Sequence, residues 1–239
     1  MSYLDHAITA LQALDRRQID KGARLLADAI TAGRSLFSFG ASHAFMVTEE
    51  LVYRAGGLML VNPIYPHGMN LSVRPITLTS QLERVVGLGR ELLAQSPARV
   101  GDVLILHSVS GRNPVTIDMA LLARERGIQT IVITALSYVG KEASRHPCGK
   151  LLAELGDVVI DNAVPHGDAV VDVPGFPQKV APLSSITGIA IANALVAETV
   201  KLLVERGTQP PVFMSANVAG GEAYNAKLLA ENKDRIHYL

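Results

Sequence analysis

Residues 104–127 read LILHSVSGRNPVTIDMALLARERG, and they contain the three parts of an α/β unit in order. The apolar run 103–106 has the length of a buried strand. Pro114 has the fixed φ favoured at the first position of a helix, and Asn113 before it is a suitable N-cap. A helical pattern then continues to a glycine, a common residue just past a helix end. The stretch therefore predicts a strand, a polar turn and a helix.

The turn between this strand and this helix is rich in hydrogen-bond donors. Ser108 and Ser110 supply hydroxyls, Asn113 supplies an amide, and Gly111 lets the backbone bend or approach a ligand closely. The first amides of a helix are unpaired and lie at the positive end of its dipole, so they stabilise an anion without a basic side chain. The turn is therefore suited to a phosphate group. The alternative is that Ser110 or Asn113 only caps the helix.

A second unit of the same kind lies at residues 35–57, SLFSFGASHAFMVTEELVYRAGG, with Gly40, Ser42 and His43 in its turn. In a doubly wound sheet the first and third strands commonly flank the point where strand order reverses, and their following loops open into one crevice. We therefore expect both turns to face one ligand. Neither turn carries a P-loop or a complete dinucleotide-binding glycine pattern, which argues against nucleoside triphosphates and dinucleotides.

Short apolar runs along the chain predict the strands of one sheet. Helical patterns separate most of these runs, and this alternation favours parallel pairing in an α/β fold. The five predicted strands are 35–39, 58–61, 103–106, 130–133 and 158–160. The predicted helices between them are 42–55, 81–94 and 115–126.

The segments outside this alternation predict helical extensions. Residues 2–32 read as one or two helices, and 184–205 read as a long helix that is apolar nearly all round. Such a helix is buried in the domain or against a second subunit, so we expect a homodimer or homotetramer. The 239 residues, of which 49% are hydrophobic, can fill a sizeable core. We expect a single domain over 1–239, with an α/β core at 35–162 and C-terminal helices at 184–235.

Composition excludes several classes of partner. Lys and Arg total 22 and Asp and Glu total 22, so no overall positive field attracts nucleic acid or an anionic membrane. The single Cys148 cannot form an intrachain disulfide, which fits a reducing cytoplasm. The N-terminus lacks the pattern of a signal peptide, and the most apolar window, 188–197, is too short to span a membrane. We therefore expect a cytoplasmic protein that binds a small ligand.

Several pieces of the chain resemble the sugar-isomerase (SIS) domain family: FGASHAF and EELVYRAGG in the first unit, SVSGRNP in the second, and the long C-terminal helix. The resemblance implies a three-layer α-β-α sandwich around a flavodoxin-like five-stranded parallel sheet. It also implies dimers or tetramers and a phosphorylated sugar held on the serine-rich turns by Ser42, Ser108, Ser110 and Asn113. Val109 stands where glucosamine-phosphate synthases have Gln, so the resemblance leaves the sugar open.

An aldose–ketose isomerase moves a proton between adjacent carbons, which requires a base, usually a carboxylate, and groups that polarise the oxygens. His43 and Glu50 lie on one side of the predicted helix 42–55, so Glu50 is a candidate base. Glu49 is the close alternative. The non-functional interpretation of Glu50 is an i,i+4 ion pair with Arg54.

Glu198 is the second candidate base, because a carboxylate within the apolar pattern of the long helix is costly unless it is paired or functional. Its alternative role is an ion pair with Lys201. Heptose-phosphate isomerases, which the chain also resembles, carry a catalytic residue on the corresponding helix. His67 and, less favoured, His166 lie in Gly/Pro-rich loops that could carry function. By resemblance to some relatives, Lys227 could approach a sugar hydroxyl.

These features give three functional hypotheses. The first is a phosphosugar isomerase that acts by carboxylate-mediated proton transfer. The second is a non-catalytic phosphosugar sensor or regulatory binding protein, and the third is a sugar-phosphate lyase or etherase, which also begins by removing a proton beside a carbonyl. No two histidines or acids have a recognised metal-ligand spacing, so we expect neither a metal nor a cofactor.

Overall fold

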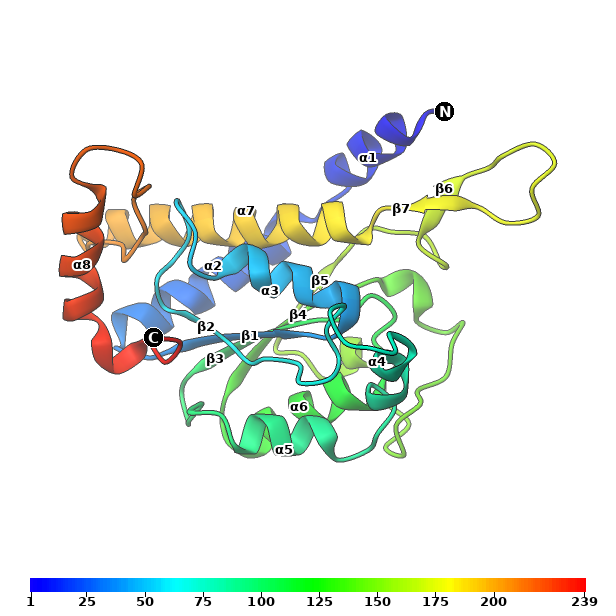
Figure 1. Ribbon diagram of the computed structural model, residues 1–239, viewed down its shortest axis with the longest axis horizontal. Helices are drawn as coiled ribbons and strands as arrows, with labels where there is room; N and C mark the ends of the chain where they lie inside the picture. Colours follow the sequence, from blue (N-terminus) through cyan, green and yellow to red (C-terminus); the bar gives the residue numbers. More distant parts are fainter.

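The computed structural model describes residues 1–239 and contains one five-stranded parallel sheet (Figure 1). All four strand pairings are parallel, and the strand order reverses between β1 and β3 as in a doubly wound fold. The expected parallel sheet is therefore confirmed. Its strands, in the spatial order β2-β1-β3-β4-β5, are β1 (Leu36–Gly40), β2 (Val61–Pro63), β3 (Val103–His107), β4 (Gln129–Thr134) and β5 (Val158–Asp161).

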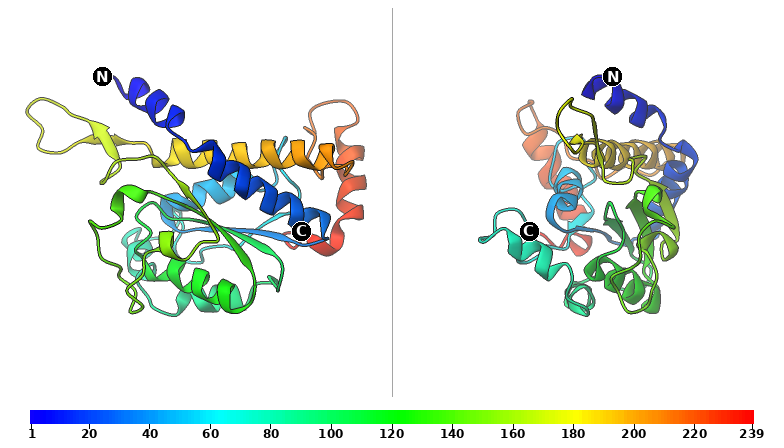
Figure 2. Two further views of the ribbon diagram at one scale, coloured as in Figure 1. Left: turned by 180° about the vertical axis from the view of Figure 1, so that it is seen from behind. Right: turned by 90° about the vertical axis from the view of Figure 1, so that its right-hand side faces the viewer.

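Helices cover both faces of the sheet and complete a three-layer α-β-α sandwich, as Figure 1 and Figure 2 show. One face is covered by α2 (Arg16–Thr31), α3 (Phe45–Leu51) and α7 (Ser184–Glu205). The other face is covered by α5 (Leu88–Ala94) and α6 (Pro114–Glu125).

Strand β3 shows why the strands are apolar along their whole length. Val103 and Ile105 belong to the core under α2 and α7, whereas Leu104 and Leu106 belong to the core over α5 and α6. Successive side chains of a strand point to opposite faces, and here both faces are covered. The continuous apolar run is therefore what a central parallel strand requires.

The N-terminal helix and a hairpin project together from one end of the sandwich (Figure 1). Helix α1 (Tyr3–Gln12) begins with a capping box formed by Ser2 and Asp5. The antiparallel strands β6 (Ala169–Val171) and β7 (Val180–Pro182) lie beside α1, and the Tyr3 hydroxyl donates to the Pro182 carbonyl at 2.8 Å. From its glycines and prolines this segment was expected to be a loop, and the hairpin was not predicted.

Three predicted elements differ from the structure by more than a residue or two at an end. Strand β2 begins at Val61, three residues beyond the predicted start, because Leu58 and Met59 pair with residues 211–212 instead of with β1. The predicted helix 81–94 is divided into α4 (Thr77–Leu82) and α5 by a turn in which the Gly87 amide donates to Asp118 Oδ2 at 2.7 Å. The predicted helix 42–55 is a 3-10 turn followed by α3, which ends at Leu51 because Val52 is extended.

The remaining elements complete the extensions. The apolar window 188–197 was expected to be too short for a membrane span, whereas the whole 22-residue helix α7 has the length and composition of one. It packs beside α2 and α3 against the sheet, and 44% of its most apolar 18-residue window is buried. It is therefore a helix of the folded domain. The final α-helix is α8 (Gly221–Glu231), and the 3-10 turns are η1 (Ser42–Ala44), η2 (Leu136–Tyr138), η3 (Leu152–Glu154) and η4 (Lys233–Arg235).

Candidate functional site

The turns that follow β1 and β3 line one cavity of about 290 Å³, which we call the serine cleft. The two strands are neighbours in the sheet, with Gly40 paired to His107. Both turns therefore begin side by side at the carboxyl edge of the sheet. The structure thus brings together Ser42 and His43 from the first turn and Ser108, Ser110 and Asn113 from the second. The complete lining is Ala41, Ser42, His43, Ala44, Glu83, Ser108, Val109, Ser110, Asn113, Tyr138 and Asp168.

The second turn presents donors that the protein does not use. The amides of residues 109–113 donate to no acceptor in the chain, and the hydroxyls of Ser108 and Ser110 make no hydrogen bond. Gly111 adopts a φ of 61°, and a Cβ there would lie 2.9 Å from Thr134 Oγ1, so only glycine fits this bend. Asn113 occupies the N-cap position of α6, but its side chain makes no capping bond. The helix-capping interpretation therefore does not account for Asn113.

The first turn is held by a close contact and a buried histidine. A Cβ at Gly40 would lie 2.3 Å from the Ala44 carbonyl oxygen, so η1 folds back directly onto the end of β1. The Ser42 amide donates to the Met69 carbonyl at 2.7 Å, and Ser42 has a positive φ of 52°. His107 Nδ1 lies 3.1 Å from the same Ala44 oxygen and donates to it.

His107 is buried beneath the serine cleft as a neutral imidazole. Burial lowers the pKa of His107 from 6.5 to about 4, an effect only partly offset by its bond to Ala44 and by the charge of Asp168. Because Nδ1 donates to a carbonyl, Nε2 is the acceptor, and the Asn162 amide lies 3.4 Å from it. Asn162 also accepts from Thr187 of α7. This chain of bonds joins the first turn to the residue that follows β5 and to α7.

Glu83 lines the serine cleft but was not predicted from the sequence. Its carboxylate accepts from the Ser42 hydroxyl at 2.5 Å and from the Asn113 side-chain amide at 2.6 Å, so it bridges the two turns. Its backbone carbonyl accepts from the Val115 amide at 3.2 Å, which fixes Glu83 against the first turn of α6. In the sequence, Glu83 fell inside a predicted regular helix and therefore gave no signal of this position.

Asp168 and Tyr138 form a further wall of the serine cleft. Asp168 Oδ1 accepts from the amides of Leu183 and Ser184 at 3.0 and 2.8 Å, and its Oδ2 accepts from the Ser184 hydroxyl. This carboxylate is therefore committed to the N-terminus of α7.

Arginines surround the outer side of the second turn. Arg145 Nη1 donates to Asn113 Oδ1 at 2.8 Å, and Arg112 pairs with Glu142. Partial burial, together with the nearby charges of Arg112 and Arg84, lowers the pKa of Arg145 from its usual value. The guanidinium groups remain charged, so they add a positive field beside the turn.

The family model of the SIS domain matches residues 2–135. The chain belongs to the SIS domain family. It is 46% identical over 246 residues to a UPF0309 protein of Shouchella clausii, with 100% of both chains covered. It is also 45% identical over 233 residues to a UPF0309 protein of Oceanobacillus iheyensis, which covers 98% of this chain and 95% of the relative. The resemblance of the two turns to this family is therefore confirmed.

Solved structures share the SIS fold at low sequence identity. The Vibrio vulnificus NanR protein complexed with ManNAc-6P aligns with a TM-score of 0.53 and 15% identity, covering 96% of this chain and 67% of NanR. The phosphoheptose isomerase GmhA of Neisseria gonorrhoeae aligns with a TM-score of 0.51 and 16% identity, covering 81% of this chain and 92% of the isomerase. At these identities the likeness shows the fold alone.

All three catalytic residues predicted from the sequence, Glu50, Glu198 and His67, lie outside the serine cleft. Glu50 pairs with Arg54, as its alternative interpretation expected, and also accepts from Asn193 of α7 at 2.7 Å. Glu198 pairs with Lys201 at 2.6 Å and lines a different hollow, between α7 and the segment joining α1 to α2. Within one chain, the carboxylates of Glu50 and Glu198 therefore contact other side chains and not the serine cleft. Their catalytic roles stay predictions.

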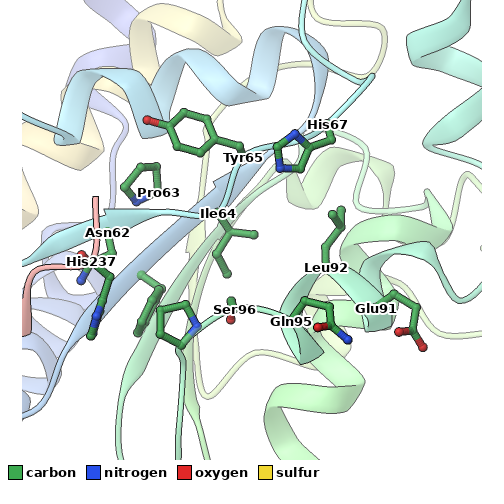
Figure 3. A pocket seen from close by; sticks show the side chains of 12 residues that line it. Asn62, Pro63, Ile64, Tyr65, His67, Glu91, Leu92, Gln95, Ser96 and His237 are labelled. Carbon is green, nitrogen blue, oxygen red and sulfur yellow. Dashed lines mark hydrogen bonds between the residues drawn. The ribbon is translucent and has the colours of Figure 1, made fainter. Parts of the chain in front are cut away.

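His67 lines another cavity, of about 420 Å³, between the edge strand β2 and α5 (Figure 3). Tyr65 and His67 lie on one side of it, and Glu91 and Gln95 on the other. His237 stacks on Phe37 at the far end, with ring centroids 5.9 Å apart. None of the serine-turn residues lines this cavity, although it is larger than the serine cleft.

Two other candidate residues also lie outside the serine cleft. His166 Nε2 lies 3.1 Å from Glu142 Oε1, and the exposed Lys227 Nζ lies 3.9 Å from Glu231 Oε1.

Proposed function

We propose that this SIS domain binds a phosphorylated sugar in the serine cleft and isomerises it. One observation carries the proposal: Ser108, Val109, Ser110 and Asn113 of the second turn, each with an unused hydroxyl or backbone amide, line the same cavity as the first turn. Unpaired backbone amides in a turn that leads into a helix form a binding site for phosphate, and arginines near the turn favour an anion further. The cavity is large enough to hold more than the phosphate, so the sugar extends toward Ser42, His43 and Glu83.

Isomerisation is the chemistry that best fits the groups beside this phosphate site. It requires a carboxylate for proton transfer and hydrogen-bond donors near the substrate oxygens, and the serine cleft contains both kinds of group. The phosphoheptose isomerase that shares the fold supports this reaction class. A lyase or etherase would use the same first proton removal, and analysis of the reaction products distinguishes it from an isomerase.

A sensor that binds a phosphosugar without converting it is the second candidate function. The NanR protein, which shares the fold, is complexed with ManNAc-6P, and this supports a binding role for the same cleft. The chain carries no net positive charge, so we expect such a sensor to act through a protein partner and not through nucleic acid.

A thermal-shift screen tests the proposal first. A ligand at 100 times its dissociation constant adds about 2.7 kcal/mol to the free energy of unfolding. We expect sugar phosphates to raise the melting temperature, whereas the same sugars without phosphate leave it unchanged. Bound sugars are then incubated in deuterated water, where an isomerase labels the carbon next to the carbonyl. Binding without exchange favours the sensor, and no stabilisation by any sugar phosphate contradicts both functions.

We also propose that the protein forms a homodimer or homotetramer in the cytoplasm. The large side chains of Leu4 and Ile8 on α1 are 69% and 55% exposed, and an apolar stripe of this kind is suited to a second copy of the helix. The unpaired, exposed Cys148 fits a reducing compartment. Light scattering after size-exclusion chromatography measures the oligomer, and Leu4→Glu with Ile8→Glu should convert it to monomer.

A further inference from the structure

We infer that Glu83 is the carboxylate that moves the substrate proton. This inference rests on the proposed function, and it replaces the two candidates from the sequence with a residue that lies in the serine cleft. It follows from the positions of the carboxylates, from the bonds that hold Glu83, and from the division of donors within the cleft.

Only two carboxylates line the serine cleft, those of Glu83 and Asp168. Asp168 accepts three hydrogen bonds from Leu183 and Ser184 at the start of α7, so moving it would leave helix amides unpaired. Glu83 makes no ion pair, in contrast to Glu50 and Glu198. The Glu83 carboxylate accepts only from the side chains of Ser42 and Asn113, so its protonation would leave no helix amide unpaired.

The bonds to Glu83 come from both turns that are proposed to hold the ligand. Ser42 donates to Oε1 and Asn113 donates to Oε2, while the Glu83 backbone is fixed at both ends by Thr79 and Val115. Each carboxylate oxygen keeps lone-pair capacity beyond its single bond. A base that is held on a fixed backbone between two ligand-binding turns meets the positional requirement for proton transfer.

The donors of the cleft divide into two groups, which leaves room for a phosphate and a reacting carbon. The free amides of Val109, Ser110 and Asn113 and the hydroxyls of Ser108 and Ser110 have no acceptor, and these residues line the cleft, so the donors are available to the phosphate. The donors Ser42 and Asn113 already hold the carboxylate. The phosphate therefore binds the second turn, and the carbonyl end of the sugar lies against Glu83.

The proton transfer balances with no further reactant. In the open-chain aldose, the Glu83 carboxylate removes the proton from C2, the C–H electron pair forms the C1–C2 double bond, and the carbonyl oxygen on C1 takes the negative charge. The proton of the C2 hydroxyl passes to that oxygen. The Glu83 carboxylic acid then returns its proton to C1 as the C2 carbonyl forms. The product is the ketose, and Glu83 is again ionised.

The test compares Glu83→Gln with the wild type and with Glu91→Gln, a matched change in the cavity of Figure 3. Each variant is assayed for sugar-phosphate affinity and for deuterium exchange at the carbon next to the carbonyl. Loss of a general base costs about 10²- to 10⁴-fold in rate. We expect Glu83→Gln to lose at least about 100-fold in exchange while binding within about tenfold of wild type, and Glu91→Gln to match wild type.

Two outcomes separate the inference from the proposed function. If wild type exchanges and Glu83→Gln exchanges equally fast, the role of Glu83 is refuted while the isomerase stands. If wild type binds sugar phosphates without exchange, the isomerase is refuted and the role of Glu83 with it.

Glu83→Asp, which keeps the charge but shortens the side chain, tests the assignment if the Gln variant is poorly folded. A fall in the exchange rate at retained affinity supports the role of Glu83, and an unchanged rate overturns it. Glu50→Gln and Glu198→Gln test the competing candidates, and a selective loss of exchange in either would also overturn it.

Discussion

The burial of His107 should make the stability of the protein depend on pH, and the size of this effect follows from the pKa of His107 in the folded and unfolded chain. The pKa of His107 is lowered from 6.5 to about 4 by burial beneath the first turn. The unfolded chain therefore binds a proton at His107 as the pH falls through 6.5, whereas the folded protein does not until the pH approaches 4. The contribution of neutral His107 to the free energy of unfolding is fully present above pH 6.5 and is lost as the pH falls toward 4.

The size of the effect follows from the two pKa values. Their difference corresponds to about 3 kcal/mol when the transition is complete, at about 1.36 kcal/mol for each pH unit. Between pH 7 and pH 5, the free energy of unfolding should fall by about 2 kcal/mol through His107 alone. His107→Gln removes the titrating group, and its amide can still donate to the Ala44 carbonyl. The variant should lose this part of the pH dependence, whatever its stability at pH 7.

Urea unfolding followed by circular dichroism measures this prediction, because the chain contains no tryptophan. The free energy of unfolding is determined at pH 7 and at pH 5 for wild type, His107→Gln and the exposed control His67→Gln. We expect His107→Gln to reduce the difference between the two pH values by about 2 kcal/mol, and His67→Gln to leave it near wild type. Equal pH dependence in wild type and His107→Gln would refute the reasoning.

Three further substitutions test other parts of the account. Gly40→Ala places a Cβ 2.3 Å from the Ala44 oxygen, so it should cost about 1–3 kcal/mol of stability in thermal unfolding and weaken sugar-phosphate binding in calorimetry. Ser110→Ala removes a donor to the phosphate, worth about 1.5–3 kcal/mol, and should weaken sugar-phosphate binding about 10- to 100-fold without changing thermal stability. Glu198→Gln breaks only the surface pair with Lys201, so its free energy of unfolding should change by less than about 1 kcal/mol; a larger loss would show that Glu198 has an unrecognised structural partner.

The sequence predicted the fold where local patterns and tertiary packing agree. The unit β3–turn–α6 has an apolar strand, Pro114 at the helix start and a glycine after its end, and the structure contains each of these elements. Strand β2 was misplaced because Leu58 and Met59 are apolar enough for a strand but pair with residues 211–212, which no local pattern reveals. Hairpin β6–β7 was missed because its strands are only three residues long and lie among glycines and prolines.

The candidate site was predictable only in part. The hydroxyls of Ser42, Ser108 and Ser110 were recognised because glycine-containing turns before helices have a sequence signature. Glu83 has none: it reaches the serine cleft only because the chain turns between α4 and α5 and because the Val115 amide holds its backbone. Glu50 and Glu198 were selected for their helical positions, and the direction in which those helix faces point is set by packing that one sequence does not reveal.

The central claim is that the two serine turns bind one phosphorylated sugar together. Nuclear magnetic resonance of ¹⁵N-labelled protein during titration with a stabilising sugar phosphate tests it most directly. If the turns share one ligand, the amide signals of Ser42 and of residues 109–113 shift together with one dissociation constant. Shifts confined to the cavity of Figure 3, around Asn62, His67 and Gln95, would contradict it.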